Sequence, residues 1–443
     1  MQKRIAEHGQ EHVLNFWDEL TDEQQSEFEQ QLTSIDFELL DNLQTQNDKE
    51  SITQLVPAPV IHLDDSYRKD GIDAIARAEL AVLTVAGGQG TRLGWSGPKG
   101  TFPATPITGK SLFQIVAEQI VFASKKYNVP IPWYIMTSNE NDAVTRAFFL
   151  DNNCFGIDRT DIFIFSQGEM PAVDEDGKIL LASKSSVAMN PDGHGGVLAA
   201  LKRSGGLEEM DAKGIKYLSY VQIDNPLAHV IDSDFLGIHL SETSSIEVTS
   251  KCVLKSDPEE RVGVFCNEDG KTTIVEYSDL PDNYAEEVDE QGNLKFFAGS
   301  IAIHLMSTSF LQRVADDLPW HKANKIIPHI DVNSGNPVLP TKPNGYKFER
   351  FVFDVLPFAK HSLVVETKRE EEFGPIKNAT GKDSAKTSQQ LQRERAVHWL
   401  RMNNVEVSDS ATVEISPLNA ASWDDLRQIK LPSSIGDVEI VVI

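Results

Sequence analysis

The 443-residue sequence is poor in cysteine and contains no long apolar run. Its cysteines are Cys154, Cys252 and Cys266, and none of them forms a Cys-x-x-Cys pair. Such a sparse, odd set argues against a disulfide framework and a zinc cluster, and it favours free thiols in a reducing compartment. No stretch approaches the roughly 18 apolar residues of a membrane span, and residues 1–19 lack the apolar core of a signal peptide. We therefore expect a soluble, cytoplasmic protein.

Positive charge is also in short supply. The chain has 41 lysines and arginines against 67 aspartates and glutamates, which gives a formal net charge of −26. Such a surface repels nucleic acids and anionic membranes, so neither is an expected partner. An anionic small molecule can still bind where a pocket holds local positive charge. Basic residues beside a glycine-rich loop are therefore the ones to follow.

Composition and length predict a folded protein of several units. Hydrophobic residues make up 40% of the chain and charged residues 24%, which is ordinary for a globular protein. The length allows roughly three units at about 150 residues each. Changes in composition and in apolar periodicity divide the chain into an N-terminal helical arm with its linker, a central domain and a small C-terminal domain. Their predicted ranges are 1–75, 76–395 and 396–443.

The N-terminal arm is predicted to be helical over residues 1–50. An apolar stripe between Val13 and Leu20 favours one helix. Thr21, with Gln24 three positions later, forms a capping-box pattern that starts a second helix, whose apolar pattern continues to Leu43. Residues 57–70 are rich in proline and aspartate and are predicted to form a linker.

The central domain alternates short apolar runs with helical periodicity. Strands are predicted at 80–85, 133–137, 162–165 and 217–223, and helices at 112–124 and 142–150. Continuous apolar runs suit strands buried on both faces of a parallel sheet, so the pattern predicts a doubly wound, Rossmann-like α/β domain. Later segments are predicted as antiparallel strands (247–253 and 271–277), strand and helix (346–363), a polar loop (382–390) and short strands (429–443).

A glycine-rich loop follows the first of these runs. It reads Ala86-Gly87-Gly88-Gln89-Gly90-Thr91-Arg92-Leu93-Gly94 and is closed by Pro98-Lys99. In open α/β sheets, ligands bind at the carboxyl ends of the strands. Glycines let the backbone approach a phosphate and expose N–H groups to it. Because Arg92 and Lys99 add local positive charge, the loop predicts a phosphate site.

Two familiar phosphate motifs do not describe this loop. A P-loop ends in Gly-Lys-Ser/Thr, whereas this loop has Thr91-Arg92-Leu93. A dinucleotide fingerprint that starts at Gly88 would need a glycine at position 93. ATPase-type and NAD-type sites are therefore not expected here.

With this loop the chain resembles the eukaryotic-type UDP-sugar pyrophosphorylases, above all the UDP-N-acetylglucosamine pyrophosphorylases. The resemblance continues in order through 133–138, 165–172, 190–196, 222–227, 262–264, 275–278, 351–355 and 369–379. It implies a nucleotidyltransferase domain of the glycosyltransferase-A-like type. The implied reaction joins the uridylyl group of UTP to a sugar-1-phosphate, with Mg²⁺ as the cofactor, and releases pyrophosphate.

The resemblance also implies a role for each matching residue. The implied UTP site consists of Val85, Ala86, Gly87, Gly88, Lys99, Gln167, Gly193, Asp224 and Lys347. The implied sugar-phosphate site consists of His194, Glu276, Ser300 and Lys377. The residues implied in the transfer step are Arg92, Lys99, Asp224 and Lys377, and Asp224 is the implied metal ligand.

Elementary chemistry gives each role a plain alternative. A strand-end aspartate such as Asp224 suits a hard cation, but it can also be only a helix cap. Lone lysines such as Lys347 and Lys377 are usually solvated surface residues. Asp354, in an apolar run expected to be a strand, is either a second carboxylate near the metal or a structural hydrogen-bond acceptor.

Two positions depart from the acetylglucosamine-specific members. Those members usually have asparagine at the positions of His194 and Ser300, whereas glucose-specific and broad-specificity relatives resemble this chain at His194. N-acetylglucosamine-1-phosphate is the first predicted substrate, and glucose-1-phosphate or a broader range is the alternative. A non-catalytic sugar-nucleotide-binding protein is a remote third reading, because Arg92, Lys99 and Asp224 are all retained. A homo-oligomer is left open.

Overall fold

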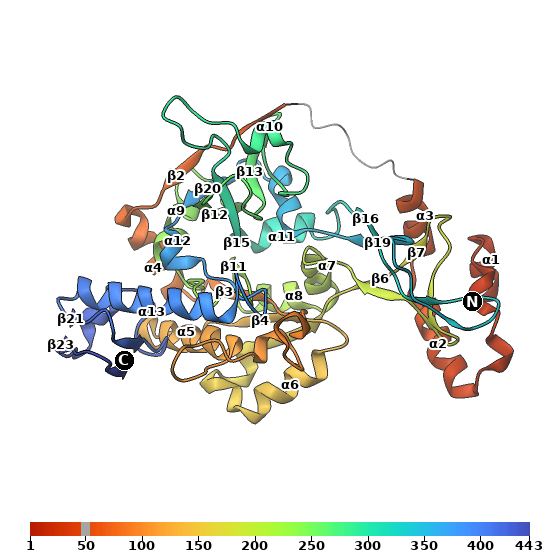
Figure 1. The fold of residues 1–443 in the computed structure, drawn as a ribbon, viewed down its shortest axis with the longest axis horizontal. Helices are drawn as coiled ribbons and strands as arrows, with labels where there is room; N and C mark the ends of the chain where they lie inside the picture. The colour runs from red at the N-terminus through yellow and green to blue at the C-terminus, as the bar shows by residue number, and fades with distance from the viewer. Residues whose placement is uncertain (46–53) are drawn as a thin grey trace. The chain divides into compact units, whose positions relative to one another are not determined.

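The computed structural model describes residues 1–45 and 54–443. The chain divides into two compact units, each built from segments far apart in the sequence (Figure 1). The first unit takes Met1–Thr53, Gln167–Ala199 and Asp317–Asp354, and the second takes Gln54–Ser166, Ala200–Asp316 and Val355–Ile443. The three domains proposed from changes in composition and apolar periodicity stay a prediction.

A central sheet organises the second unit. Its main path runs β2-β20-β12-β15-β11-β3-β4-β5. The strands are β2 (Val60–His62), β20 (Leu363–Glu366), β12 (Val248–Leu254), β15 (Ala298–Ser307), β11 (Tyr217–Gln222), β3 (Leu80–Val85), β4 (Trp133–Thr137) and β5 (Ile162–Ser166). Strands β11, β3, β4 and β5 are mutually parallel, and β15 is antiparallel to both its neighbours. The predicted α/β class is confirmed, as are the four predicted strands of the parallel part.

Helices enclose this sheet within the second unit (Figure 1). They are α4 (Arg68–Ala76), α5 (Leu112–Tyr127), α6 (Asp142–Asp151), α8 (Gly206–Ala212), α9 (Ser233–Leu240), α10 (Asp282–Ala285), α11 (Thr308–Val314), α12 (Arg369–Glu372) and α13 (Ala385–Met402). Both helices predicted between the early strands are confirmed as α5 and α6. Helix α5 begins where the hydroxyl of Ser111 accepts from the amide of Gln114, and its apolar face packs into the core with β3 and β4.

The later part of the second unit adds antiparallel pairing. Strands β13 (Val264–Glu268) and β14 (Lys271–Val275) form a hairpin, as the alternation at 271–277 predicts. The strand predicted at 247–253 is β12, which is antiparallel to β15 but parallel to β20. Near the C-terminus, β21 (Glu406–Val407) pairs with β23 (Ser434–Ile435), and β22 (Thr412–Glu414) pairs with β24 (Ile440–Val442). The short strands predicted after residue 429 are thus present.

Two predictions for the second unit are wrong. The predicted linker 57–70 holds the end of β1 (Leu55–Pro57), β2, a short 3₁₀ turn and the start of α4. Strands β1 and β2 form because β13 and β20, which come hundreds of residues later, supply their pairing partners. The predicted loop 382–390 contains the start of α13, because Ser384 and Thr387 cap it reciprocally and Ser388 is buried.

The first unit packs its N-terminal helices on small sheets. Helices α1 (Gln2–Glu7), α2 (Asp22–Ser34) and α3 (Phe37–Thr45) share a core with residues near β6 (Glu169–Pro171), β7 (Val173–Asp174), β10 (Met189–Pro191) and β19 (Gly345–Glu349). The predicted capping box of Thr21 and Gln24 is confirmed. The stripe from Val13 to Leu20 forms two short 3₁₀ turns in place of one helix, because tertiary packing of Val13 and Phe16 overrides the local periodicity.

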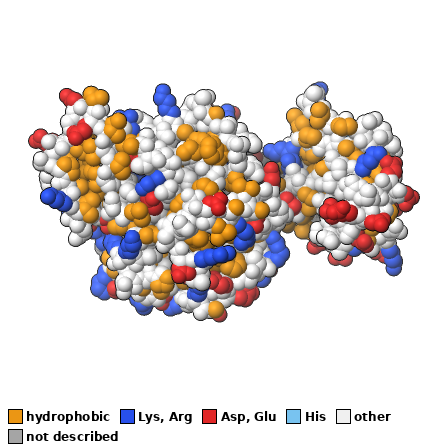
Figure 2. Space-filling view, turned by 90° about the horizontal axis from the view of Figure 1, so that it is seen from below, with side chains coloured by type: hydrophobic (Ala, Val, Ile, Leu, Met, Phe, Trp, Pro, Cys, Tyr) orange, Lys and Arg blue, Asp and Glu red, His pale blue; other side chains and the backbone are white. Residues whose placement is uncertain are grey.

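Surface properties agree with the composition. Acidic side chains gather on the first unit in Figure 2, where α2 exposes Asp22, Glu23 and Glu29. All three cysteines are buried and unpaired, and burial raises the pKa of the Cys252 thiol to about 12. Among the described residues, no helix is long and apolar enough to cross a membrane.

Candidate active site

The glycine loop leaves the carboxyl end of β3 with its backbone partly unpaired. Ala86 still belongs to the sheet, because its amide donates to the carbonyl of Met136 at 2.8 Å. The next three amides, those of Gly87, Gly88 and Gln89, donate to no acceptor in the described part of the chain. A Cβ on Gly88 would meet no atom within 4 Å. Three successive free N–H groups beside open space can bind an anion.

The far side of the loop is closed by its own backbone. The amide of Lys99 donates to the carbonyl of Gly88 at 3.0 Å, and the amide of Gly90 donates to the carbonyl of Gly97 at 2.9 Å. Gly94 ends the intervening 3₁₀ turn with a φ of 70°, a conformation that glycine adopts without strain. The sequence therefore folds here into a braced loop that presents the free amides.

Asp224 lies beside the start of this loop. Strands β11 and β3 are parallel neighbours with Gln222 opposite Val85, and Asp224 is the second residue beyond β11. Its carboxylate is 13% exposed and accepts from the ammonium of Lys99 at 3.3 Å. The structure thus brings together the predicted nucleotide loop, Lys99 and the predicted metal ligand.

A backbone hydrogen bond of the preceding residue places Lys377 near Asp224. The amide of Ile376 donates to the carbonyl of Asp224 at 2.8 Å, which places Lys377 one residue from the Asp224 turn. The side chains of Lys377 and Arg92 are exposed, and neither has an ion-pair partner among the described residues. Both cations are available for a phosphate.

Glu276 and Ser300, the predicted sugar-facing residues of the second unit, meet at Gly263. The amide of Ser300 donates to the carbonyl of Gly263 at 2.8 Å. A Cβ on Gly263 would lie 3.4 Å from the carboxylate oxygen Oε1 of Glu276. Both side chains are half-buried. The two predicted sugar contacts therefore both lie beside Gly263.

The remaining predicted residues belong to the first unit. Gly193 has a φ of 82°, and a Cβ there would lie 2.4 Å from the carbonyl of Arg350, so only glycine fits this turn. The turn is locked by an ion pair between Asp192 and Arg350 at 3.0 Å. Gln167, at the unit's edge, is buried, and Lys347, on β19, is half-buried without an ion-pair partner among the described residues.

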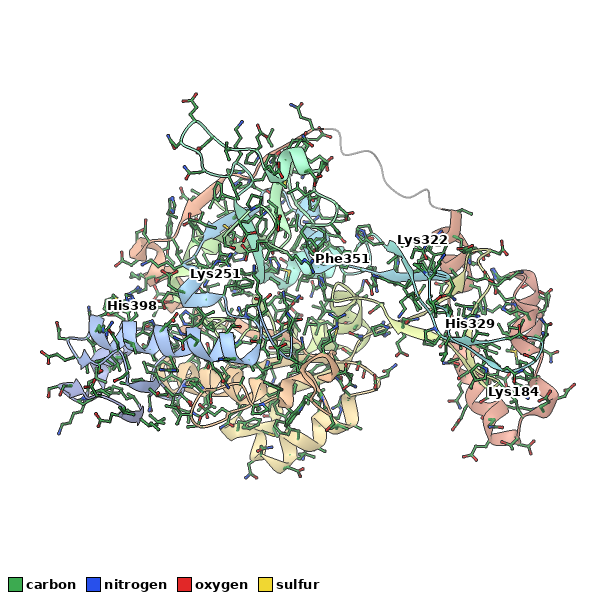
Figure 3. All side chains as sticks on the ribbon, in the orientation of Figure 1. Lys184, Lys251, Lys322, His329, Phe351 and His398 are labelled. Atoms are coloured by element: carbon green, nitrogen blue, oxygen red, sulfur yellow. The ribbon has the colours of Figure 1, made fainter. Side chains whose placement is uncertain are left out.

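His194 is held as a neutral hydrogen-bond donor. Its Nδ1 accepts from the amide of Val352 at 3.2 Å, and its ring packs beside those of Phe351 and Phe353; Phe351 is marked in Figure 3. Burial lowers the pKa of His194 to about 4, and the nearby His321 adds to the effect. At neutral pH the proton therefore sits on Nε2.

Asp354 acts as a structural hydrogen-bond acceptor in the first unit, which is one of the two roles predicted for it, and a place near the metal stays a prediction. It lies in the 3₁₀ helix η8 (Val352–Phe358), and the prediction of a strand there is wrong. Its carboxylate pairs with Nε2 of His321 at 2.8 Å and accepts from the amide of Phe351. Proline 357 and these local contacts favour a turn over an extended chain.

Sequence reasoning missed residues that support the site from behind. Asn141 donates through its side chain to the carbonyl of Ala86 at 3.1 Å and so braces the glycine loop. Asn225 and Lys251 hold the segments on either side of Asp224 and Lys377. Asn225 adjoins Asp224 in the sequence, which is a usable signal, but nothing local marks Lys251 as buried.

A parallel sheet with a free-amide loop and a carboxylate at neighbouring strand ends suits a nucleotidyltransferase, the class of enzyme to which this chain belongs. The family model described as UTP–glucose-1-phosphate uridylyltransferase matches residues 27–418. The chain belongs to this family of UDP-sugar pyrophosphorylases.

Individual relatives cover nearly the whole chain. The UDP-N-acetylhexosamine pyrophosphorylase-like protein 1 of Xenopus tropicalis is 36% identical, over 94% of this chain and 91% of its own. The UDP-N-acetylglucosamine pyrophosphorylase of Saccharomyces cerevisiae is 34% identical, over 96% of each. The crystal structure of the Trypanosoma brucei UDP-N-acetylglucosamine pyrophosphorylase, in complex with an inhibitor, is similar with a TM-score of 0.85 and 28% identity, over 96% of this chain and 93% of that one.

Proposed function

We propose that this protein transfers the uridylyl group of UTP to N-acetylglucosamine-1-phosphate and releases pyrophosphate. The observation that carries the proposal is the group of three free amides beside the Lys99–Asp224 pair. A phosphate oxygen of the sugar attacks the α-phosphorus of UTP, the bond from that phosphorus to the bridging oxygen breaks, and pyrophosphate leaves. Such a transfer depends on positioning and charge neutralisation, so no side-chain nucleophile is needed.

Each predicted residue keeps its role as part of this proposal. The backbone from Val85 to Gly88 binds the nucleotide, and Gln167 and Gly193 contact the uracil. Charge on the triphosphate and on the departing pyrophosphate is neutralised by Arg92, Lys99 and Lys347. The sugar phosphate is bound by Lys377 and the sugar by His194, Glu276 and Ser300.

Members of this family generally use a divalent metal ion, and we propose Mg²⁺ held by Asp224. The described residues contain no cluster of three or more histidine, cysteine or acidic side chains that could hold a metal. A single carboxylate still fits Mg²⁺, because this ion usually keeps several waters and binds through one or two carboxylates plus substrate phosphates. When bound, the ion supplies charge neutralisation at the phosphates.

Glucose-1-phosphate is the second candidate acceptor, and His194 is the observation that favours it. The resemblance places histidine here in glucose-specific and broad-specificity relatives, and the structure supplies a neutral Nε2 donor. A donor of this kind serves a sugar hydroxyl as well as an acetamido oxygen. The order of the two sugars therefore rests on experiment.

A substrate panel tests both points. Purified protein is incubated with UTP, Mg²⁺ and the 1-phosphates of N-acetylglucosamine, glucose, galactose and N-acetylgalactosamine, and pyrophosphate release is measured. We expect release with N-acetylglucosamine-1-phosphate and none when ATP replaces UTP. No release with any sugar would refute the transferase, and a hundredfold preference for glucose-1-phosphate, about 2.7 kcal/mol in transition-state binding, would reverse the order of sugars.

Location and assembly are further parts of the proposal. Three buried, unpaired cysteines agree with a reducing compartment, and we propose a cytoplasmic site of action. Size measurement by light scattering determines whether the protein forms a homo-oligomer.

A further inference from the structure

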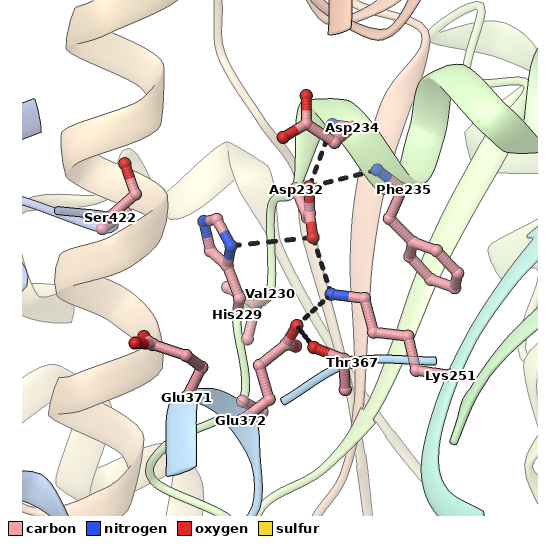
Figure 4. Close-up of polar contacts among 12 residues, drawn as sticks. His229, Val230, Asp232, Asp234, Phe235, Lys251, Thr367, Glu371, Glu372 and Ser422 are labelled. Atoms are coloured by element: carbon pink, nitrogen blue, oxygen red, sulfur yellow. Dashed lines mark hydrogen bonds and ion pairs between the residues drawn. The ribbon is translucent and has the colours of Figure 1, made fainter. Parts of the chain in front are cut away.

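Behind Asp224 lies a polar junction that the proposed chemistry does not use directly. It joins residues 224–232, which follow β11, to residues 367–377, which follow β20. We call it the Asn225 junction. Figure 4 shows its buried half, and all of its residues belong to the second unit.

Lys251, on β12, is the fixed point of the junction. Its side chain is fully buried in the second unit (Figure 3), and its ammonium donates to Asp232 at 2.6 Å and to Glu372 at 2.5 Å. Burial alone lowers the pKa of Lys251, but attraction by the two carboxylates outweighs it and raises the pKa. One cation therefore ties a residue from each segment to the central sheet.

The carboxylates at this cation also fix their own backbones. Asp232 caps α9 by accepting from the amides of Asp234 and Phe235. Glu372 ends α12, and its Oε1 accepts from the hydroxyl of Thr367 at 2.8 Å. Both segments are thus anchored at points away from the predicted phosphate contacts.

Asn225 makes the direct link between the segments. Its side-chain Nδ2 donates to the carbonyl of Glu372 at 2.7 Å, and its Oδ1 accepts from the amide of Gly374 at 3.1 Å. The side chain is 7% exposed. An amide is the group that can donate to one backbone and accept from the same backbone two residues later.

The link lies one residue from Asp224 and three residues before Lys377. On the other side of Asn225, the amide of Ile376 donates to the carbonyl of Asp224. Gly374 permits the close approach, because a Cβ there would lie 2.6 Å from Cδ1 of Leu227. Three hydrogen bonds therefore join the two segments, and the absence of a side chain at Gly374 lets them pack closely.

We propose that Asn225 is a positioning residue, which sets the spacing between the metal ligand Asp224 and the sugar-phosphate ligand Lys377. The inference rests on the proposed function, because those two roles do. Transfer requires the attacking phosphate and the charge-neutralising groups to be placed within a fraction of an ångström, and misplacement by about 1 Å can cost about a hundredfold in rate. Asn225 touches no substrate in this proposal and acts through its neighbours.

A matched control contacts the same segment from another helix. Gln119, on α5, is also a buried amide that donates to one backbone carbonyl (Ala228, 3.1 Å) and accepts from an amide two residues later (Val230, 3.2 Å). It braces residues 228–230, away from Asp224 and Lys377. Truncation of either amide removes a similar side chain and similar hydrogen bonds, but only Asn225 links residues 224–232 to residues 367–377.

The test compares Asn225→Ala and Gln119→Ala in the full-length protein. We expect similar decreases in melting temperature, but a tenfold to hundredfold lower kcat and a higher Mg²⁺ concentration for half-maximal activity only in Asn225→Ala. The KM for UTP should change little, because the glycine loop is untouched. Equal kcat and equal Mg²⁺ dependence in the two variants would overturn the positioning role.

A second variant covers the case in which Asn225→Ala does not fold. Gly374→Ala leaves Asn225 in place and puts a Cβ 2.6 Å from Cδ1 of Leu227, which crowds the packing between the two segments, and it should give a lower kcat and a higher Mg²⁺ requirement. Leu227→Val in that background removes Cδ1 and should restore part of the rate; failure of both effects would overturn the inference. Wild-type protein that releases no pyrophosphate with any sugar would instead disprove the proposed function.

Discussion

The glycine loop after β3 and the Asn225 junction lie beside the same strand ends, but they are built in opposite ways. The loop leaves the amides of Gly87, Gly88 and Gln89 without acceptors and faces open space at Gly88. The centre of the junction, at Asn225, Lys251 and Glu372, is buried, and its polar groups are paired within the unit except for Oε2 of Glu372. The comparison teaches that, under the proposed function, the backbone with free amides binds the nucleotide, and the backbone with paired amides holds the binding groups in place.

The largest expected effect comes from breaking the junction at Lys251. Lys251→Met leaves Asp232 and Glu372 as uncompensated buried charges, and we expect a loss of about 3–5 kcal/mol in the free energy of unfolding. Urea denaturation measures it. The control is Lys69→Met, whose exposed partner is Asp73 and whose cost should stay below about 1 kcal/mol. A small effect in Lys251→Met would show that the junction tolerates loss of its cation.

Asp224 lies between the glycine loop and the Asn225 junction, and Asp224→Asn should change activity without changing stability. We expect turnover to fall by about two to three orders of magnitude, because a neutral amide binds the proposed Mg²⁺ more weakly and that ion neutralises charge on the phosphates, with little change in melting temperature. Asp425→Asn is the control, since Asp425 is also buried and pairs with a lysine, Lys126, at 2.6 Å. That variant should lose stability and keep its turnover. Unchanged activity in Asp224→Asn would contradict the metal assignment.

Gly88 and Gly100 test the difference between a glycine that faces open space and one that is tightly packed. A Cβ on Gly100 would lie 2.2 Å from the ring of Phe113, so Gly100→Ala should cost about 1–3 kcal/mol of stability. Gly88→Ala should leave the melting temperature nearly unchanged and raise the KM for UTP, because the new methyl group occupies the open space at the free amides. Thermal melts and UTP titrations measure both variants. An equal loss of stability in the two would remove the distinction.

The smallest expected effect is the pH dependence of the free energy of unfolding that comes from a buried histidine near the Asn225 junction. His239, on α9, is buried, and burial lowers its pKa to about 3 from an unfolded value near 6.5. The unfolded chain then binds more protons between these values, so stability is lost as the pH falls below about 6.5. We expect about 1 kcal/mol from this residue between pH 7 and pH 5.5.

Denaturation at the two pH values checks this dependence. His239→Gln should lose stability less steeply as the pH falls, whereas Gln in place of the exposed His361 should leave the slope as it is. An unchanged slope in His239→Gln would show that the buried imidazole does not control it.

Sequence reasoning succeeded where local pattern and tertiary role agree. The runs that became β3 and β4 are apolar on both faces because both faces are covered, and Thr21 caps α2 through residues within one turn. It failed where a distant partner decides the structure, as at β2, which becomes a strand because it pairs with β20, about 300 residues later. The start of α13 was missed because a polar, serine-rich segment is helical only when capped and docked.

The candidate site divides in the same way. The glycine loop and Asp224 could be predicted, since the residue types that bind phosphate and cations stand directly after strands. Of the supporting residues, Asn225 has a local signal in its position next to Asp224, whereas Lys251 acquires its role from burial, which no local pattern predicts. The roles of all the predicted site residues stay predictions until the substrate panel and the variants are measured.

The pairing of the Asp224 carbonyl with the amide of Ile376 has a consequence for biosynthesis. A ribosome must release most of the chain before this bond can form, and β2 must likewise wait for β20. Contacts of such long sequence separation slow folding and leave unpaired strand edges exposed in the meantime. We expect nascent or truncated chains that end before Ile376 to be inactive and prone to aggregation. Only chains that extend beyond Ile376 then contribute activity, and chaperones that bind the exposed strand edges during synthesis should increase the yield of active protein.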